Sequence, residues 1–416
     1  MNLIIYAIPV FFLLIGVELI IAKMKGLSYY RFNDAVTNLS LGIGSTISGI
    51  FLKTLTVIVY IKLFEISPLK GKIPNTWWVY VLLFFGVDFF YYWFHRLAHE
   101  ISIMWGSHAV HHQSEEYNLT VALRQAWYQG AFSFVFYLPL ALLGFNPAMF
   151  FIVSQVITLY QFWIHTKLIK KLPAPLEYVL NTPSHHRVHH GVNPQYIDKN
   201  HAGTLIIWDR MFGTFEPEEE EVVYGITKQA KSWNPVWVNF EYWVDLGRDL
   251  RKAGSLRNRY NMLVKMPGWK PEELGGVAAF KPVTPETFNK YDTEIPAGLN
   301  YYILAQFIII LVAATSFLIY QGQSPINDST GLKAALAGLI IFSLFNIGGI
   351  FEKKSWVLPL EYLRIVALAL VVIVLFNHYS LTNSIGVTTL ALGLISAIWL
   401  SRYINEFKPK TSSSYV

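Results

Sequence analysis

Histidine is the residue type whose number and spacing point most directly to chemistry in this chain. Nine of the twelve histidines fall in two clusters, at residues 95–112 and 185–190. The first cluster holds an HxxxH motif, from His95 to His99, followed by an HxxHH motif, and the second cluster holds HxxHH again. Residues three and four apart share one face of a helix, so we expect each motif to aim two or three imidazoles at one point.

These imidazoles suit metal ions, because neutral histidine is the commonest metal ligand in proteins. One structural zinc takes four ligands, whereas the three motifs hold eight histidines, so the sequence predicts two adjacent metals with about four ligands each. Nitrogen-rich sites suit iron, copper, zinc or nickel. A single motif would equally fit packed histidines or a pH sensor, but chance rarely repeats helical spacing three times. The predicted ligands are His95, His99, His108, His111, His112, His186, His189 and His190.

The composition is that of a membrane protein. Of the 416 residues, 53% are hydrophobic and only 14% are charged, and the mean hydropathy is +0.37. The chain has no cysteine, which excludes disulfides, iron–sulfur clusters, thiolate-ligated haem and a catalytic thiol. Basic loops on the cytoplasmic side of a membrane explain the net charge of +6. No nucleic-acid-binding motif accompanies this charge, so we expect no nucleic acid partner.

Long apolar runs predict an all-α fold, a polytopic membrane bundle of about nine spans with a histidine-rich helical cap in the cytosol. We expect three regions: N-terminal transmembrane helices at residues 1–94, a catalytic region with a membrane hairpin and the cap at 95–298, and C-terminal transmembrane helices at 299–416. The expected spans cover about residues 3–22, 38–64 and 77–94, a two-span hairpin from 127 to 165, and then 301–320, 332–351, 357–377 and 381–400.

Loop charge predicts how these spans are oriented. When loops are counted alternately, the basic ones fall on one side together with all three histidine motifs, which places the motifs at the cytosolic face. Residues 228–268 alternate aromatic and basic side chains and are expected to lie on the membrane as an amphipathic helix. The acidic run at 216–221 is expected to be a solvated loop. We expect a multi-pass protein of the bacterial inner membrane, or of the endoplasmic reticulum if the chain is eukaryotic.

The membrane setting narrows the chemistry. Two redox metals close together can use O₂ to attack an unactivated C–H bond, whereas two zincs would activate water for hydrolysis. An alkyl or acyl chain can enter such a site from the bilayer. A metal transporter or sensor would need ligands within the spans, whereas the motifs lie just outside them. Glu100, next to His99, is a candidate to orient a ligand, bind a metal or contact a cofactor. Asp88, inside the third span, is either functional or hydrogen-bonded to another helix.

Longer strings around the histidines carry a family resemblance. They are YYWFHRLAHE at 91–100, HAVHHQSE at 108–115, YQFWIHT at 160–166, NTPSHHRVHHG at 181–191 and WDRMFGTF at 208–215. With these strings the chain resembles the fatty acid hydroxylase and sterol desaturase superfamily of membrane di-iron enzymes. Within that superfamily, the closer resemblance is to the alkylglycerol monooxygenases. The resemblance covers about residues 77–270.

This resemblance implies an enzyme with two iron ions that uses O₂ and tetrahydrobiopterin. It would hydroxylate the carbon next to the ether oxygen of an alkylglycerol, and the hemiacetal would collapse to a fatty aldehyde and glycerol. By the same resemblance the eight motif histidines are iron ligands, His165 is a further ligand and Glu100 is a functional acid. His201 stands where the superfamily often has an aromatic residue. It is either an extra ligand or a hydrogen-bonding substitute, and we favour the hydrogen-bonding role.

The expected partners are a lipid substrate from the bilayer, O₂, membrane lipids and an electron donor, either the pterin or a reductase. A sterol, carotenoid or fatty-acyl hydroxylase or desaturase would use the same ligands with a different substrate slot. The residues alone leave this alternative open.

Overall fold

A computed structural model describes residues 3–277, 283–323, 330–379 and 383–408. Within these ranges the regular structure is helical, and the β-type pairings are two isolated bridges, Leu180 with Leu205 and Gly191 with Tyr224. The chain divides into two compact units. One comprises Met1–Ala230 with Asn239–Tyr291, and the other comprises Lys231–Val238 with Asp292–Val416. The all-α prediction is confirmed.

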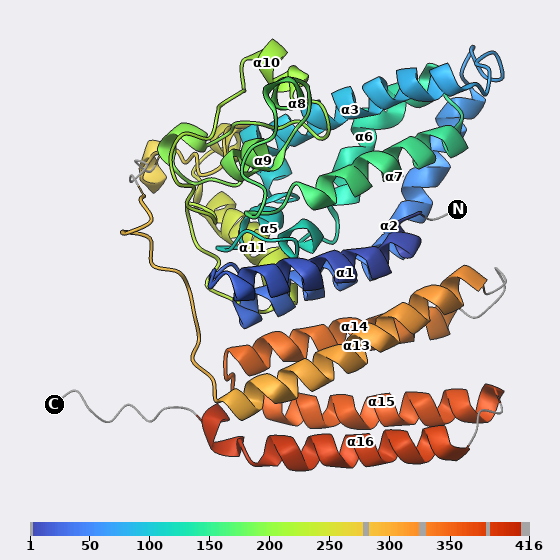
Figure 1. Ribbon diagram of the computed structural model, residues 1–416, viewed down its shortest axis with the longest axis vertical. Helices are drawn as coiled ribbons and strands as arrows, with labels where there is room; N and C mark the ends of the chain where they lie inside the picture. Colours follow the sequence, from blue (N-terminus) through green and yellow to red (C-terminus); the bar gives the residue numbers. More distant parts are fainter. Residues whose placement is uncertain (1–2, 278–282, 324–329, 380–382, 409–416) are drawn as a thin grey trace. The chain divides into compact units, whose positions relative to one another are not determined.

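The first unit is built on five apolar helices, of which α3, α6 and α7 lie alongside one another (Figure 1). Helix α6 packs against α2 and α3, and α7 packs against α1 and α3. Side chains such as Leu83, Val87, Leu140, Met149 and Val153 fill the core between α3, α6 and α7. The five helices are α1 (Leu3–Met24), α2 (Phe32–Glu65), α3 (Trp77–Glu100), α6 (Gln129–Leu142) and α7 (Pro147–Trp163).

Shorter helices fill the polar part of this unit and carry most of the histidines. Helix α3 continues without a break beyond residue 94, where the third span was expected to end, and carries His95 and His99. The amphipathic stretch expected at 228–268 forms two helices rather than one. The shorter helices are α4 (Ser102–Trp105), α5 (Ala109–His112), α8 (Ala174–Val179), α9 (Pro183–His189), α10 (Ile207–Phe212), α11 (Pro235–Lys252) and α12 (Leu256–Val264), with 3₁₀ turns at Val121–Leu123, Pro194–Tyr196 and Glu272–Leu274.

Two glycines of α2 let the segment after the second histidine motif approach the helix closely. A Cβ atom on Gly42 would lie 2.7 Å from the carbonyl oxygen of Leu123, and one on Gly44 would lie 2.3 Å from the ring of Trp127. Side chains larger than hydrogen are therefore excluded at both positions. Small residues are typical of positions where another segment approaches a membrane helix closely.

The second unit contains four apolar helices, α13 (Ala297–Gln323), α14 (Thr330–Phe351), α15 (Val357–Tyr379) and α16 (Asn383–Ser401). Consecutive helices pack against each other, and α16 also contacts α13. A buried ion pair within α15 joins Arg364 Nη2 to Glu361 Oε1 over 2.7 Å. Tyr302 and Asn346 donate hydrogen bonds to the same carboxylate, so polar side chains of three helices meet inside an apolar bundle.

Six helices among the described residues are long and apolar enough to cross a membrane, so the chain is an integral membrane protein. They are Tyr6–Met24, Phe32–Leu52, Trp77–Glu100, Ala297–Gln321, Gly331–Phe351 and Val357–Val374. The predicted count of nine spans is not confirmed. The other three predicted spans fall on shorter apolar helices, Gln129–Leu142, Pro147–Trp163 and Gly386–Ser401. The first of these is about 21 Å long at 1.5 Å per residue, less than the ~30 Å of a hydrocarbon core.

Candidate metal centre

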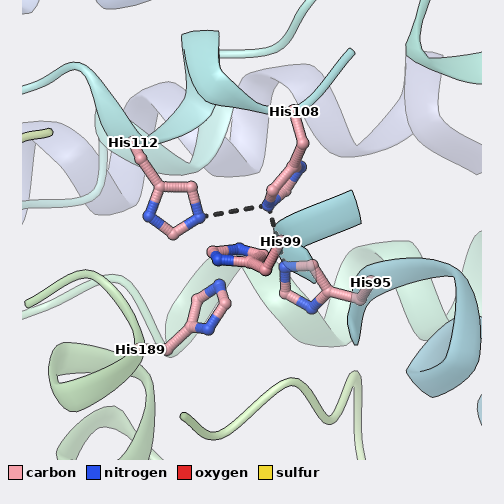
Figure 2. Close-up of side chains that lie close together, drawn as sticks. All are labelled: His95, His99, His108, His112 and His189. Carbon is pink, nitrogen blue, oxygen red and sulfur yellow. Dashed lines mark hydrogen bonds between the residues drawn. The ribbon is translucent and has the colours of Figure 1, made fainter. Parts of the chain in front are cut away.

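The nine predicted histidine ligands come together as two buried groups. The first group is His95, His99, His108, His112 and His189, and the second is His111, His165, His186 and His190. Within each group the candidate ligand nitrogens all lie within 4.8 Å of one another. Figure 2 shows the first group, with the five rings converging from separate segments of the chain. We call these two sets the five-histidine group and the four-histidine group.

Each HxxHH motif aims the two imidazoles four residues apart at one group, as the spacing predicted, and its third imidazole at the other group. His111 and His112 are adjacent on α5, yet His112 belongs to the five-histidine group and His111 to the four-histidine group. His189 and His190 divide in the same way. Successive residues on a helix point about 100° apart, so an adjacent pair necessarily faces two directions. The two HxxHH motifs therefore place the two groups next to each other, and only HxxxH serves a single group.

Ring nitrogens within each group approach at the distances expected of ligands to one ion. His108 Nε2 lies 2.8 Å from His95 Nε2 and 3.1 Å from His112 Nε2, and Figure 2 marks both contacts. In the four-histidine group, His165 Nε2 lies 3.3 Å from His111 Nε2 and 3.0 Å from His186 Nε2. Two nitrogens bound at right angles, each about 2.1 Å from a metal, would be roughly 3.0 Å apart. The spacing therefore fits a metal ion in each group.

Backbone carbonyls select the tautomer of several of these rings. Carbonyl oxygens accept hydrogen bonds and never donate them, so a ring nitrogen facing one must carry the proton. The Nδ1 atoms of His95, His111, His165 and His189 face carbonyl oxygens at 2.7–2.9 Å. In each ring this leaves the lone pair on Nε2, which points into the group. A hydrogen-bond acceptor for the ring nitrogen that does not bind the metal is typical of histidine ligands in metal sites.

Unpartnered nitrogens inside the groups also fit a metal. The buried Nε2 atoms of His99, His189 and His190 have no hydrogen-bond partner in the part of the chain that the structure describes. A buried polar atom without a partner destabilises a fold unless something binds it. A metal ion in each group would satisfy all three lone pairs.

Burial keeps the imidazoles neutral. Loss of solvation lowers the pKa of His108 to about 3 and that of His165 to about 4. The pKa values of His111, His112 and His190 fall well below the usual range, because burial and then the neighbouring imidazoles disfavour the charged form. Neutral imidazole is the form that ligates metals, so these rings are ready to bind at neutral pH without losing a proton.

The two acidic residues singled out in the sequence, Glu100 and Asp88, lie outside both groups. Glu100, at the end of α3, accepts a hydrogen bond from Arg96 Nε at 2.8 Å, and its side chain is 39% exposed. Its catalytic role stays a prediction. Asp88 accepts hydrogen bonds from the backbone N–H groups of Thr204 and Leu205 and from the indole of Trp208. Asp88 therefore ties α3 to the segment before α10, which is the structural alternative stated for it.

Two histidines near the groups have other partners. His185 Nε2 lies 3.0 Å from Glu177 Oε2, away from the second motif's ligand face. His201 is fully buried, and its carbonyl oxygen accepts the hydrogen bond from His95 Nδ1. The prediction that His201 forms hydrogen bonds is confirmed, since its ring Nε2 also lies 3.1 Å from the carbonyl oxygen of Asp198.

Arg124 is a structural support that the sequence did not identify. Its carbonyl oxygen accepts from His111 Nδ1, and its buried guanidinium donates to the carbonyl of Val110 and to Asn38 Oδ1. It thereby anchors the second motif to α2. In the sequence, Arg124 is visible only as an arginine directly before the membrane hairpin. Its position there does not indicate which residues it contacts.

Comparison with known proteins places this site in a family. Residues 80–214 match the fatty acid hydroxylase family, a range that includes all nine histidines. An alkylglycerol monooxygenase from Xenopus tropicalis is 41% identical over 85% of this chain and 78% of its own length. The chain belongs to the alkylglycerol monooxygenase family. The human alkylglycerol monooxygenase is 38% identical over 86% of this chain and 80% of its own length.

Membership of the alkylglycerol monooxygenase family makes the chain an oxygen-dependent oxidoreductase, a membrane monooxygenase of lipids. A more distant relative, an ornithine lipid hydroxylase from Rhizobium tropici, is 30% identical over 38% of this chain and 50% of its own length. No solved structure matches the chain.

Proposed function

We propose that this chain is a di-iron monooxygenase that cleaves the ether bond of alkylglycerols. The carbon next to the ether oxygen is hydroxylated, and the resulting hemiacetal breaks into a fatty aldehyde and glycerol. One atom of O₂ enters the C–H bond, and the other leaves as water with two electrons and two protons from a donor. The observation that carries this proposal is the pair of adjacent, all-imidazole groups in a chain of the alkylglycerol monooxygenase family.

Nitrogen donors alone make up both groups, a set that suits iron among other metals. Iron in both groups, held by the nine histidines, would supply the activation of O₂ needed to attack a C–H bond. The protein's own contribution is to hold the rings neutral, to fix their tautomers through backbone carbonyls and to exclude water. All nine side chains are buried, which supports the exclusion of water.

The substrate class and the electron donor rest on the relatives. Two vertebrate relatives at 38–41% identity are alkylglycerol monooxygenases, which favours ether lipids over sterols, carotenoids or acyl chains. Tetrahydrobiopterin is the proposed electron donor, with a reductase as the alternative. Glu100 is proposed as the acid that contributes to catalysis without ligating a metal in either group.

Isotope tracing tests the reaction. The purified protein is incubated with a 1-O-alkylglycerol, tetrahydrobiopterin and ¹⁸O₂, and the aldehyde is trapped as it forms. Hydroxylation at the ether carbon puts ¹⁸O into the aldehyde and leaves the glycerol unlabelled. Release of a fatty alcohol in place of the aldehyde, with no oxygen taken from O₂, would indicate hydrolysis and overturn the proposal. Oxidation of a sterol or acyl chain in place of the alkylglycerol would leave the proposed metal site standing and overturn the proposed substrate.

The metal groups are proposed to lie at the cytosolic face of a membrane. The absence of cysteine allows a clean test by single-cysteine labelling. Exposed Glu219, in the same polar region as the second cluster, is replaced by cysteine, and exposed Lys70, between α2 and α3, serves as the matched control. A membrane-impermeant maleimide applied to sealed cells should label Lys70→Cys and leave Glu219→Cys unlabelled. The reverse pattern would overturn the orientation.

A further inference from the structure

A four-residue loop at 198–201 backs three of the five rings in the five-histidine group. The carbonyl oxygen of Lys199 accepts from His189 Nδ1 at 2.9 Å, and that of His201 accepts from His95 Nδ1 at 2.7 Å. The carboxylate oxygen Oδ1 of Asp198 lies 3.5 Å from Nδ1 of His99. One short loop thus presents acceptors to ligands that come from α3 and from α9.

The loop achieves this with an unusual backbone. Asp198 and Asn200 both have φ of +56°, in the left-handed region that residues other than glycine rarely adopt. Aspartate and asparagine tolerate this region better than other residues with a Cβ atom. These two residues alternate with Lys199 and His201, whose carbonyl oxygens are the ones that face the imidazoles. The ring of His201 braces the turn by its contact with the carbonyl of Asp198.

Asn200 holds the loop in place from the side away from the metals. Its side chain is fully buried, and its amide nitrogen donates to the carbonyl oxygens of His185 and Glu216 at 3.1 and 2.8 Å. Its amide oxygen accepts from the backbone N–H of Glu216 at 2.9 Å, and its own N–H donates to the carbonyl of Thr214. The amide nitrogen, the amide oxygen and the backbone N–H of this asparagine all bind backbone groups, and none of these bonds reaches a ligand ring.

The four-histidine group is backed by other segments. His111 Nδ1 faces the carbonyl of Arg124, and His165 Nδ1 faces the carbonyl of Gln161. Neither acceptor belongs to the loop at 198–201. The two groups, although adjacent, therefore differ in what orients their ligands.

We propose that the loop at 198–201, locked by Asn200, is a positioning device for the metal of the five-histidine group and not for the other metal. This inference rests on the proposed function, because both groups must hold a metal ion. The loop fixes the tautomer and direction of His95, His99 and His189, and Asn200 is a positioning residue that touches neither the metals nor the substrate. Loss of such backing typically weakens metal affinity by about tenfold to a hundredfold.

The test compares Asn200→Ala with Asn200→Gly and with wild type. Both variants remove the amide, but glycine tolerates the left-handed backbone and alanine does not. Each purified protein is loaded anaerobically with ⁵⁷Fe, and its iron content and Mössbauer spectrum are measured. His186→Ala, which removes a ligand of the four-histidine group, is the matched control for the other metal. Monodisperse elution and a wild-type thermal transition establish that each variant is folded.

We expect Asn200→Ala to lose one Mössbauer component and to keep the other, while His186→Ala loses the component that Asn200→Ala keeps. Asn200→Gly should fall between wild type and Asn200→Ala. Wild-type iron affinity and spectra in both Asn200 variants would overturn the inference alone. Equal loss of both components in folded Asn200→Gly would also overturn it. A wild type that binds no pair of irons would overturn the proposed function first and this inference with it.

Discussion

The imidazoles of His111 and His112 stand almost perpendicular, with an angle of 89° between their planes and 5.4 Å between their centroids, and they belong to different histidine groups. His189 and His190 repeat this relationship at 90° and 5.3 Å. Two pairs of adjacent residues thus fix how close the groups lie. Because the two rings of an adjacent pair point in different directions, they reach two ions more readily than one. This is the structural reason for expecting two metals here.

Single substitutions within an adjacent pair should have unequal effects. His112→Ala leaves four histidines in its group, whereas His111→Ala leaves three in the other. We expect His111→Ala to fall from about two irons to about one per chain, and His112→Ala to keep about two with weaker affinity, because four ligands still hold an ion. Elemental analysis across an iron titration measures both. Equal iron loss in the two variants would contradict the division into groups.

The stability of the metal-free protein should fall as the pH falls below neutral. Histidine titrates near pH 6.5 in an unfolded chain, whereas burial lowers the pKa of His108 to about 3 and of His165 to about 4 in the folded chain. The unfolded state therefore binds more protons between these values, and each such histidine removes up to about 1.4 kcal/mol of stability per pH unit. Thermal unfolding of the metal-free protein should shift to lower temperature from pH 7 to pH 5. From pH 9 to pH 8 these residues are neutral in both states, which serves as the internal control. A Tm that stays constant down to pH 5 would show that the histidines are not buried as described.

The ion pair inside the second unit gives a separate stability prediction. Arg364→Met leaves Glu361 buried beside Tyr302 without its cation, and we expect a loss of about 3–5 kcal/mol. Glu361→Gln combined with Arg364→Met removes both charges and should recover most of the loss. Thermal unfolding in detergent measures both variants. If the double variant is no more stable than Arg364→Met, the cost lies in packing and not in the unpaired carboxylate.

Glu100 should affect turnover without affecting metal content. It lies in neither histidine group and pairs with Arg96, so Glu100→Gln should retain iron and lose about a hundredfold in kcat if the acid takes part in proton transfer. Glu115→Gln is the matched control, because Glu115 bonds to Arg31 and to the backbone of Tyr291. Wild-type turnover in Glu100→Gln, or iron loss in that variant, would contradict the proposed role.

Helical spacing was sufficient to identify eight of the nine histidines, because it is a local property and recurs three times. The ninth, His165, stands in no motif and was predicted from the family resemblance alone. The sequence was not sufficient to divide the nine histidines between two groups. That division depends on how α5 and α9 are turned relative to α3, which is set by long-range contacts such as those of Arg124 with Asn38. The role of the loop at 198–201 was also out of reach, because the ligand imidazoles donate to its backbone carbonyls, and backbone acceptors leave no residue-type signature.

The two remaining differences have clear physical causes. The membrane hairpin was expected as two spans, which is not confirmed, because its apolar helices α6 and α7 have only 14 and 17 residues. The acidic run at 216–221 was expected to be fully solvated, yet Glu218 forms two hydrogen bonds of 2.6 Å with Arg187, which is buried. Arg187 lies within the second histidine motif, so this ion pair helps to fix α9 in place. The sequence alone does not show which glutamate of such a run forms an ion pair with a residue far away in the chain.

The iron content of the purified wild-type protein decides whether the two histidine groups form a di-iron site. The protein is prepared in detergent, loaded anaerobically with ferrous iron, desalted and measured for all transition metals. We expect about two irons per chain, one for each group of four or five imidazoles. Two zincs that persist after iron loading, or no stoichiometric metal at all, would contradict a di-iron oxygenase and require another explanation for the nine buried histidines.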